Sequence, residues 1–252
     1  MTTVPEYDVV PAQRPTPQRV IVVADDGAPA MDSAGAWAHD AARIRRSAVL
    51  RVHLDLHNPA AFAERLPAGT ELVVVPAPHG LLHKRIHNQA VTTLLDYADV
   101  VVVPQERGAR SDAPVLVAVH GSSPADRRAI GAAFTAASQA AAPLVAVHCW
   151  SEPGALDLPA ASWLPIDYAN YRERESELVA ESLAGYQESF PDVSVERVIR
   201  SGRAGSALLP LARDAQIVVV GGGRQTIGLP KGAYSALLRD AGVPVLIVSD
   251  RG

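Results

Sequence analysis

Short apolar runs alternate with amphipathic segments along most of the chain. The runs are continuous rather than alternating, which is typical of strands in a parallel sheet that helices cover on both faces. The predicted strands are residues 19–24, 49–54, 72–75, 100–103, 115–119, 144–149, 193–199, 217–220 and 243–248. The amphipathic segments predict helices at 31–46, 60–66, 82–97, 125–140, 168–189, 206–212 and around 233–241. This alternation predicts an α/β protein with doubly wound parallel sheets.

The series of strands and helices runs through the chain twice. The two halves end alike, in LLDYADVVVVP and LLRDAGVPVLIV, so the chain is predicted to hold an internal repeat. We divide it into a flexible, proline-rich lead at 1–17, a shorter first domain at 18–104, a polar linker at 105–113 and a second domain at 114–252.

Composition and charge narrow the possible partners. Hydrophobic residues make up 48% of the 252 residues and charged residues 20%, as in ordinary globular proteins. A net charge of −4 argues against nucleic acid as a partner. The absence of an apolar run of about 18 residues argues against a membrane span. A single cysteine, Cys149, fits a reducing compartment, and the first residues lack the pattern of a signal peptide, so we expect a cytoplasmic protein.

The segment 215–248 contains a strand, a glycine turn and a helix in succession. Gly221–Gly223 follow the strand, and Lys231-Gly232 precede the helix. Glycine allows the backbone to approach a phosphate closely, and a helix N-terminus offers free N–H groups. The segment therefore predicts an anion site, although every doubly wound fold also needs such turns for connectivity.

Several motifs of the second half occur in the order found in the universal stress protein family. They are VLVAVHGSSPADRRAI, LVAVHCW, RVIRSGRAGSALLPLARDAQIVVVGGG and AGVPVLIV. The second half therefore resembles a universal stress protein domain over nearly its whole length. The first half resembles a shortened, diverged copy, mainly in VIVVADDGAP and AVLRVHL. The resemblance implies two tandem Rossmann-like domains, dimerisation and, in one subgroup, ATP bound at the strand ends.

ATP-binding members of that family have an aspartate after the first strand and the glycine pattern G-x2-G-x9-G-(S/T). In the second half, the aspartate position holds His120 and the fourth loop position holds Arg224. The loop from Gly221 to Gly232 is two residues shorter than the pattern, and Ala233 takes the place of the hydroxyl residue. The resemblance thus implies a damaged phosphate site. Its candidate nucleotide residues are His120, Cys149, Gly221, Gly223, Arg224, Lys231 and Gly232, with Cys149 aligned to the adenine pocket but also expected in the core.

The first half departs from the pattern in the opposite way. Asp25 stands at the aspartate position, but Pro76 replaces the first glycine and Asn88-Gln89 replace the Gly-Ser pair. Proline lacks an N–H and restricts the backbone, whereas a phosphate nest needs backbone N–H donors and conformational freedom. We therefore expect neither half to keep the whole ATP site, so no cofactor is assigned and ATP stays the one candidate.

Other polar groups offer weaker candidates. His79, His83 and His87 recur every four residues, as metal ligands on a helix do, but no acidic or cysteine partner lies near them, so we expect structural roles and no metal site. Ser122 and Ser123 precede a predicted helix, with Asp126 three or four residues further on, which matches a variant of a helix capping box rather than a nucleophile. Without a catalytic set, we predict a non-enzymatic protein that acts in a stress response by binding or through an unidentified protein partner. The alternatives are an ATP-binding sensor using residues 221–232 and, more distantly, a metal-binding protein.

The last strand of each half is predicted to lie at a sheet edge. In the family, this strand pairs antiparallel with its counterpart across a two-fold axis. We expect 100–103 and 245–248 to pair within one chain as a pseudo-dimer, or else between two chains as a homodimer.

Overall fold

The computed structural model describes residues 19–78, 81–105, 112–120, 123–150, 168–201, 204–222 and 231–251. Strands and helices alternate through both halves. The first half comprises β1 (Val20–Asp25), α1 (Met31–Arg45), β2 (Ala48–His53), α2 (Pro59–Ala63), β3 (Thr70–Pro76), α3 (Leu81–Leu94) and β4 (Asp99–Val103). The second half comprises β5 (Val115–Val119), α4 (Pro124–Ala140), β6 (Leu144–Trp150), α5 (Tyr168–Ser189), β7 (Val195–Ser201), α6 (Ala204–Arg213), β8 (Ile217–Gly221), α7 (Lys231–Asp240) and β9 (Val245–Val248).

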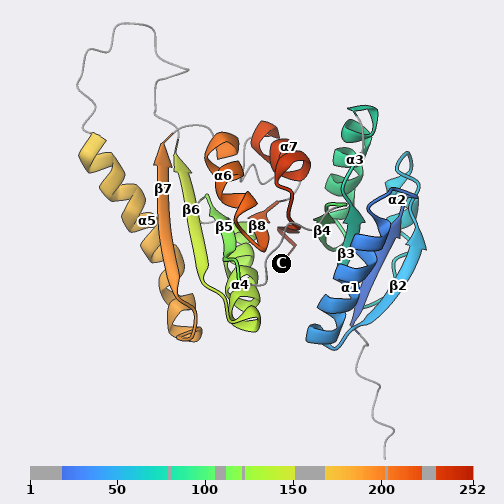
Figure 1. Ribbon diagram of the computed structural model, residues 1–252, viewed down its shortest axis with the longest axis horizontal. Helices are drawn as coiled ribbons and strands as arrows, with labels where there is room; N and C mark the ends of the chain where they lie inside the picture. Colours follow the sequence, from blue (N-terminus) through green and yellow to red (C-terminus); the bar gives the residue numbers. More distant parts are fainter. Residues whose placement is uncertain are drawn as a thin grey trace, which may run out of the picture.

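All the strands of the described segments form one sheet, in the order β2-β1-β3-β4-β9-β8-β5-β6-β7 (Figure 1). Among the strands that the structure describes, pairing is parallel within each half and antiparallel only between β4 and β9, where Val101 faces Leu246. The two halves are therefore joined through their last strands into a continuous sheet.

In the described residues, the second half has one strand and one helix more than the first. In the second half, β6 pairs with β5 on one side and with β7 on the other. In the first half, β2 is the outermost strand of the described sheet, and the side chain of Leu50 on it is 42% exposed. The shortened first repeat therefore leaves open the position that β7 fills in the second.

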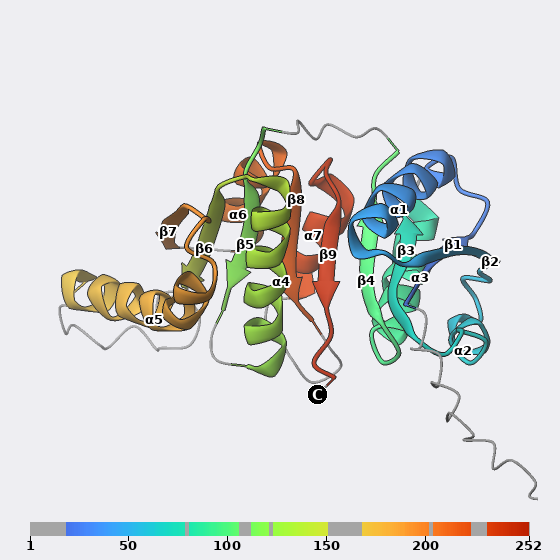
Figure 2. The same cartoon turned by 90° about the horizontal axis from the view of Figure 1, so that it is seen from below.

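The sheet separates two cores, each shared by both halves. Alternate residues of a strand point to opposite faces, so Val218 and Val220 join one core while Val219 joins the other. The first core includes residues of α3, α6 and α7, and the second includes residues of α1, α4 and α5. Figure 2 shows α1 and α4 on opposite sides of the β4–β9 seam.

The elements lie where the hydrophobic pattern predicted them, with shifts at their ends. The predicted helix 82–97 ends earlier, at Leu94, and the predicted strand 72–75 extends from Thr70 to Pro76. Of the two serines predicted to precede α4 in a capping box, Ser123 is the cap, because its side chain accepts a hydrogen bond from Asp126 N. Among the described helices, none combines the length and apolar character that crossing a bilayer requires.

Candidate functional site

The candidate site of the second half lies at the carboxyl ends of β5 and β8. These strands are neighbours, while the chain leaves them toward different sides of the sheet, which is where doubly wound proteins bind ligands. His120 follows β5, Gly221 ends β8, and Lys231 and Gly232 form the first turn of α7. The predicted residues Gly223 and Arg224 lie outside the described segments.

Gly221 is required by packing. A Cβ at this position would lie 2.9 Å from the carbonyl carbon of Ala125 and 3.0 Å from both N and Oδ1 of Asp126. A Cβ on Gly222 would lie 2.6 Å from Cγ2 of Ile247. Two of the three glycines are thus explained by the close approach of α4 and β9, with no ligand needed to account for them.

A buried carboxylate stands beside Gly221. Asp126 is 3% exposed, and its Oδ2 accepts a 2.8 Å hydrogen bond from the Ser123 hydroxyl. The backbone N–H of Asp126 in turn donates to Ser123 Oγ at 3.1 Å. The N-terminus of α4 therefore already holds an anion of the protein's own, and a phosphate beside Gly221 would meet a like charge.

His120 takes the place of the family's aspartate with different chemistry. Burial lowers the pKa of His120, an effect that His148 reinforces and Asp126 opposes. The rings of His120 and His148 lie 6.5 Å apart between centroids. An imidazole held neutral offers one donor and one acceptor, whereas a carboxylate offers two acceptors to a ribose.

His148 is held by two acceptors. Its Nδ1 lies 2.7 Å from Val119 O, and its Nε2 lies 2.7 Å from Oε2 of Glu175 on α5. A carbonyl oxygen only accepts, so Nδ1 donates to Val119 O, and Nε2 faces the Glu175 carboxylate. This pair ties α5 to the ends of β5 and β6.

Cys149 lies on the opposite face of β6 from His148. It is 7% exposed and belongs to the first core. Burial raises the pKa of its thiol to about 11, with Arg200 acting weakly in the other direction. The thiol is therefore neutral and enclosed, which is the environment of a small apolar residue rather than a nucleophile.

In the first half, Asp25 is engaged by the protein itself. Its Oδ2 accepts a 2.8 Å hydrogen bond from Arg51 Nε on β2, and its Oδ1 accepts one of 3.0 Å from Gly27 N. Asp26 closes a similar turn by accepting from Ala28 N at 2.9 Å. The carboxylate that binds ribose in the family is thus occupied by a guanidinium and a turn.

His87 closes the end of β3. Its Nε2 lies 2.8 Å from Pro76 O, and its side chain is fully buried. Burial lowers the pKa of His87, against smaller opposing effects of the Pro76 carbonyl and of Asp26. A neutral imidazole must donate from Nε2 to that carbonyl, and Nδ1 is then a buried acceptor with no hydrogen-bond partner among the described residues.

A cavity of about 240 Å³ lies at the carboxyl ends of β1 and β2. Its polar walls include Asp26, His53, Asp55 and His57, with Leu54 and Ile86 among its apolar residues. No set of three His, Cys, Asp or Glu side chains in the described part of the chain could hold a metal ion. Of the three spaced histidines, only His87 can be assessed, because His79 and the side chain of His83 lie outside the described parts.

The structure brings together residues that the sequence pattern did not associate with the site. Arg51 on Asp25 and Glu175 on His148 come from neighbouring elements, so no local motif could reveal them. Asp126 was predicted as a cap, but its position against Gly221 follows only from the packing of α4 on β8.

The fold and the strand-end positions define a tandem, doubly wound α/β protein whose ligand site would lie at the carboxyl ends of the strands. Residues 113–249 match the family model described as the universal stress protein family. The chain is also 34% identical over 215 residues to a universal stress protein of Mycolicibacterium smegmatis, an alignment that covers 82% of this chain and 68% of that relative. The chain therefore belongs to the universal stress protein family, as its motifs predicted.

Another relative matches a shorter part of the chain. Universal stress protein Rv1996 of Mycobacterium tuberculosis (strain ATCC 25618 / H37Rv) is 39% identical over 157 residues, covering 61% of this chain and 49% of the relative. The alignment thus spans about half the length of that curated relative.

Solved structures share the fold. Protein PA1789 of Pseudomonas aeruginosa PAO1, described as functionally unknown, aligns with a TM-score of 0.53 at 18% identity and covers 92% of this chain and 82% of its own. A universal stress protein of Archaeoglobus fulgidus DSM 4304 aligns with a TM-score of 0.50 at 16% identity, covering 86% and 76%. The predicted tandem α/β architecture is confirmed.

Proposed function

We propose that the chain acts in a stress response through binding, without catalysing a reaction, and that neither strand-end site holds ATP in the pose of the family's nucleotide-binding members. The observation that carries this proposal is the contact of Gly221 with the N-terminus of α4. There the glycine backbone lies against Asp126, whose buried carboxylate takes up the positive end of the helix dipole.

The two halves support the proposal in complementary ways. In the second half, His120 stands where the family has an acceptor for ribose hydroxyls. In the first half, the aspartate is present, but Arg51 binds it at 2.8 Å. Pro76 ends β3 there and offers no N–H, and its carbonyl is bound by His87. Each half thus lacks a different part of the nucleotide cradle.

The alternative is an adenine-nucleotide sensor that uses residues 221–232. What favours it is the start of α7 at Lys231, because the first N–H groups of that helix have no partner within the helix itself.

Thermal unfolding with and without 5 mM ATP and magnesium separates the two candidates. The proposal expects an unchanged Tm. Binding at about 100 times Kd would add about 2.7 kcal/mol and raise Tm by several degrees. A rise that Gly232→Glu abolishes and Asp25→Ala preserves would overturn the proposal in favour of the second-half sensor.

One chain is proposed as the functional unit. The β4–β9 pairing then takes the place of the pairing between subunits, and the alternative is a homodimer in which two chains swap or pair through these strands. Light scattering after size exclusion tests this, with the mass of a single chain as the expected result. The proposal includes a cytoplasmic location, which one cysteine in 252 residues favours, and a protein partner that is still to be identified.

A further inference from the structure

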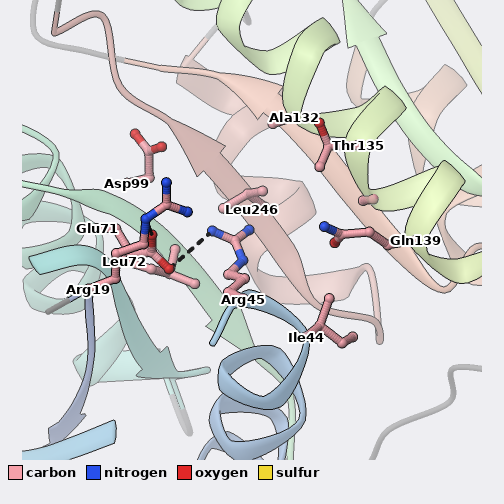
Figure 3. Close-up of a pocket in the computed structure, with 11 residues that line it drawn as sticks. Arg19, Ile44, Arg45, Glu71, Leu72, Asp99, Ala132, Thr135, Gln139 and Leu246 are labelled. Carbon is pink, nitrogen blue, oxygen red and sulfur yellow. Dashed lines mark ion pairs between the residues drawn. The ribbon is translucent and has the colours of Figure 1, made fainter. Parts of the chain in front are cut away.

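A groove of about 370 Å³ lies between the two repeats, on the face of the sheet that α1 and α4 cover (Figure 3). Its position is distinct from both strand-end sites, because it opens over the β4–β9 seam. Residues of both repeats line it, so neither repeat alone forms it. Its volume falls in the range of small-molecule sites.

The wall formed by the first repeat carries two guanidinium groups. Arg45 at the end of α1 and Arg19 before β1 lie 3.8 Å and 4.0 Å from the carboxylate of Glu71. These distances mark ion pairs that are too long for hydrogen bonds. The closer hydrogen bond to Glu71 comes from the Ser47 hydroxyl, at 2.9 Å.

Both guanidinium groups are accessible from solvent, because the Arg19 side chain is 70% exposed and the Arg45 side chain 35%. Within the described segments, neither Arg19 nor Arg45 donates a side-chain hydrogen bond, and the two positive charges share one carboxylate. The second acid of the groove, Asp99, is already bound by Arg128 and Ser249. The groove thus has guanidinium donors for a ligand, while both of its carboxylates are already paired with positive or hydrogen-bonding groups. These features favour an anion over a cation as its ligand.

The floor and the opposite wall have different chemistry. Leu72 and Leu246 form a buried apolar floor. On α4, the small side chains of Ala132 and Ala136 leave the groove open, and the Gln139 amide extends toward Arg45 (Figure 3). No other described residue hydrogen-bonds that amide. The groove therefore combines an anion-binding wall with an apolar floor and one free amide.

We propose that this groove binds a small amphipathic anion, with its carboxylate or phosphate on Arg19 and Arg45 and its apolar body on Leu72 and Leu246. The two guanidiniums provide charge-assisted donors in planar forks that match an oxyanion. Such a ligand contacts both repeats, so its concentration affects how the two repeats are arranged.

Methyl NMR of the full chain, with labelled Ile and Leu, tests the proposal. The probes are octanoate, octyl phosphate and octan-1-ol, which share one chain and differ in the head group. We expect saturable shifts at Leu72, Leu246 and the exposed Ile44, with one of the anions binding at least tenfold more tightly than the alcohol. Whichever of octanoate and octyl phosphate binds more tightly shows whether the head group of the ligand is a carboxylate or a phosphate ester.

Matched variants separate this site from non-specific binding. The double variant Arg19→Gln/Arg45→Gln should weaken anion binding at least tenfold, while Arg43→Gln on the same helix should not, because Arg43 is not among the residues that line the groove. Ala136→Leu should fill the groove and abolish binding without altering its charge. Equal affinity for octan-1-ol, no saturable shift, or unchanged binding by the double variant would overturn the proposal.

Discussion

Asp99 and Ser249 join the two repeats across 150 residues of sequence. Oδ1 of Asp99, at the start of β4, accepts hydrogen bonds from the Ser249 backbone N–H at 2.9 Å and from its hydroxyl at 3.0 Å. Arg128 on α4 adds contacts of 3.3 Å and 3.2 Å to the two oxygens of the same carboxylate. One side chain of the first repeat thus anchors the C-terminal end of β9 and a helix of the second.

Replacement of Asp99 by alanine should weaken the junction between the repeats. It removes the acceptor for the N–H and hydroxyl of Ser249, a fully buried residue, and it leaves Arg128 without its carboxylate. Loss of a buried polar partner costs about 1–3 kcal/mol, which should lower the free energy of unfolding measured in urea by that amount.

Arg43→Ala is the control for this loss, because its ion pair with Asp40 is on the surface and should change stability by less than about 0.5 kcal/mol. If Asp99→Ala were as harmless as this control, the contact would not hold the repeats together.

Gly221→Ala should destabilise the protein whether or not a nucleotide is present. The new Cβ would press on the backbone of Ala125 and Asp126, so β8 or α4 must shift, at a cost of about 1–3 kcal/mol. Gly35→Ala is the opposite case, because open space surrounds that helical position and alanine should add about 0.5–1 kcal/mol. Chemical denaturation of both variants without ligand measures the difference. A neutral Gly221→Ala would contradict the packing role.

The fold was predictable because its signals are local and repeated. Apolar runs such as 100–103 and 217–220 mark strands by composition alone, and the similar endings of the halves reveal the repeat. The ends of elements were less predictable. Leu95 and Tyr97 continue the apolar pattern of α3, but the helix ends at Leu94, and Leu95 is nevertheless buried in the first core.

The strand-end positions of the candidate residues were predictable, but their partners were not. The motif pattern located His120, Gly221 and Asp25 at the strand ends, as the structure has them. It could not predict that Arg51 binds Asp25, because that contact depends on the register of β1 against β2, which sets Asp25 opposite His53. The groove between the repeats carries no motif at all, since it exists only once β4 and β9 have paired.

The Cys149 thiol should resist alkylation in the folded protein. Its pKa of about 11, against an ordinary 9.0, reduces the reactive thiolate on the order of 100-fold before its enclosure is counted. Iodoacetamide labelling followed by mass spectrometry should therefore be slow in buffer and fast in urea. Rapid labelling of the folded chain would show that β6 opens or that the thiol is accessible.

The raised pKa of the Cys149 thiol also predicts a loss of stability at high pH. The unfolded thiol loses its proton above about pH 9, whereas the folded thiol keeps its proton up to about pH 11. The unfolded state therefore gains free energy by ionising as the pH rises through this window, and stability falls. Urea unfolding from pH 8 to 10 should show a smaller fall for Cys149→Ala than for the natural sequence. Equal slopes would contradict the prediction.

The lowered pKa of His87 predicts a loss of stability at acidic pH. Burial lowers its folded-state pKa below the ordinary value of 6.5, so the unfolded chain binds a proton at pH values where the folded chain does not. The contribution of His87 to the free energy of unfolding should be constant above about pH 6.5. It should decline as the pH falls from there to the folded-state pKa. His120, whose pKa is lowered in the same direction, should add to the decline.

The variant His87→Gln isolates the contribution of His87, because a glutamine amide can still donate to Pro76 O but does not titrate. In urea unfolding between pH 5 and pH 8, His87→Gln should lose less stability on acidification than the natural sequence. His39→Gln, on the exposed face of α1, should retain the full loss. An unchanged slope in His87→Gln would mean that the acid sensitivity arises elsewhere, with His120→Gln as the next variant to measure. A reduced slope would locate it at the end of β3, where the family has its first loop glycine and this chain has Pro76.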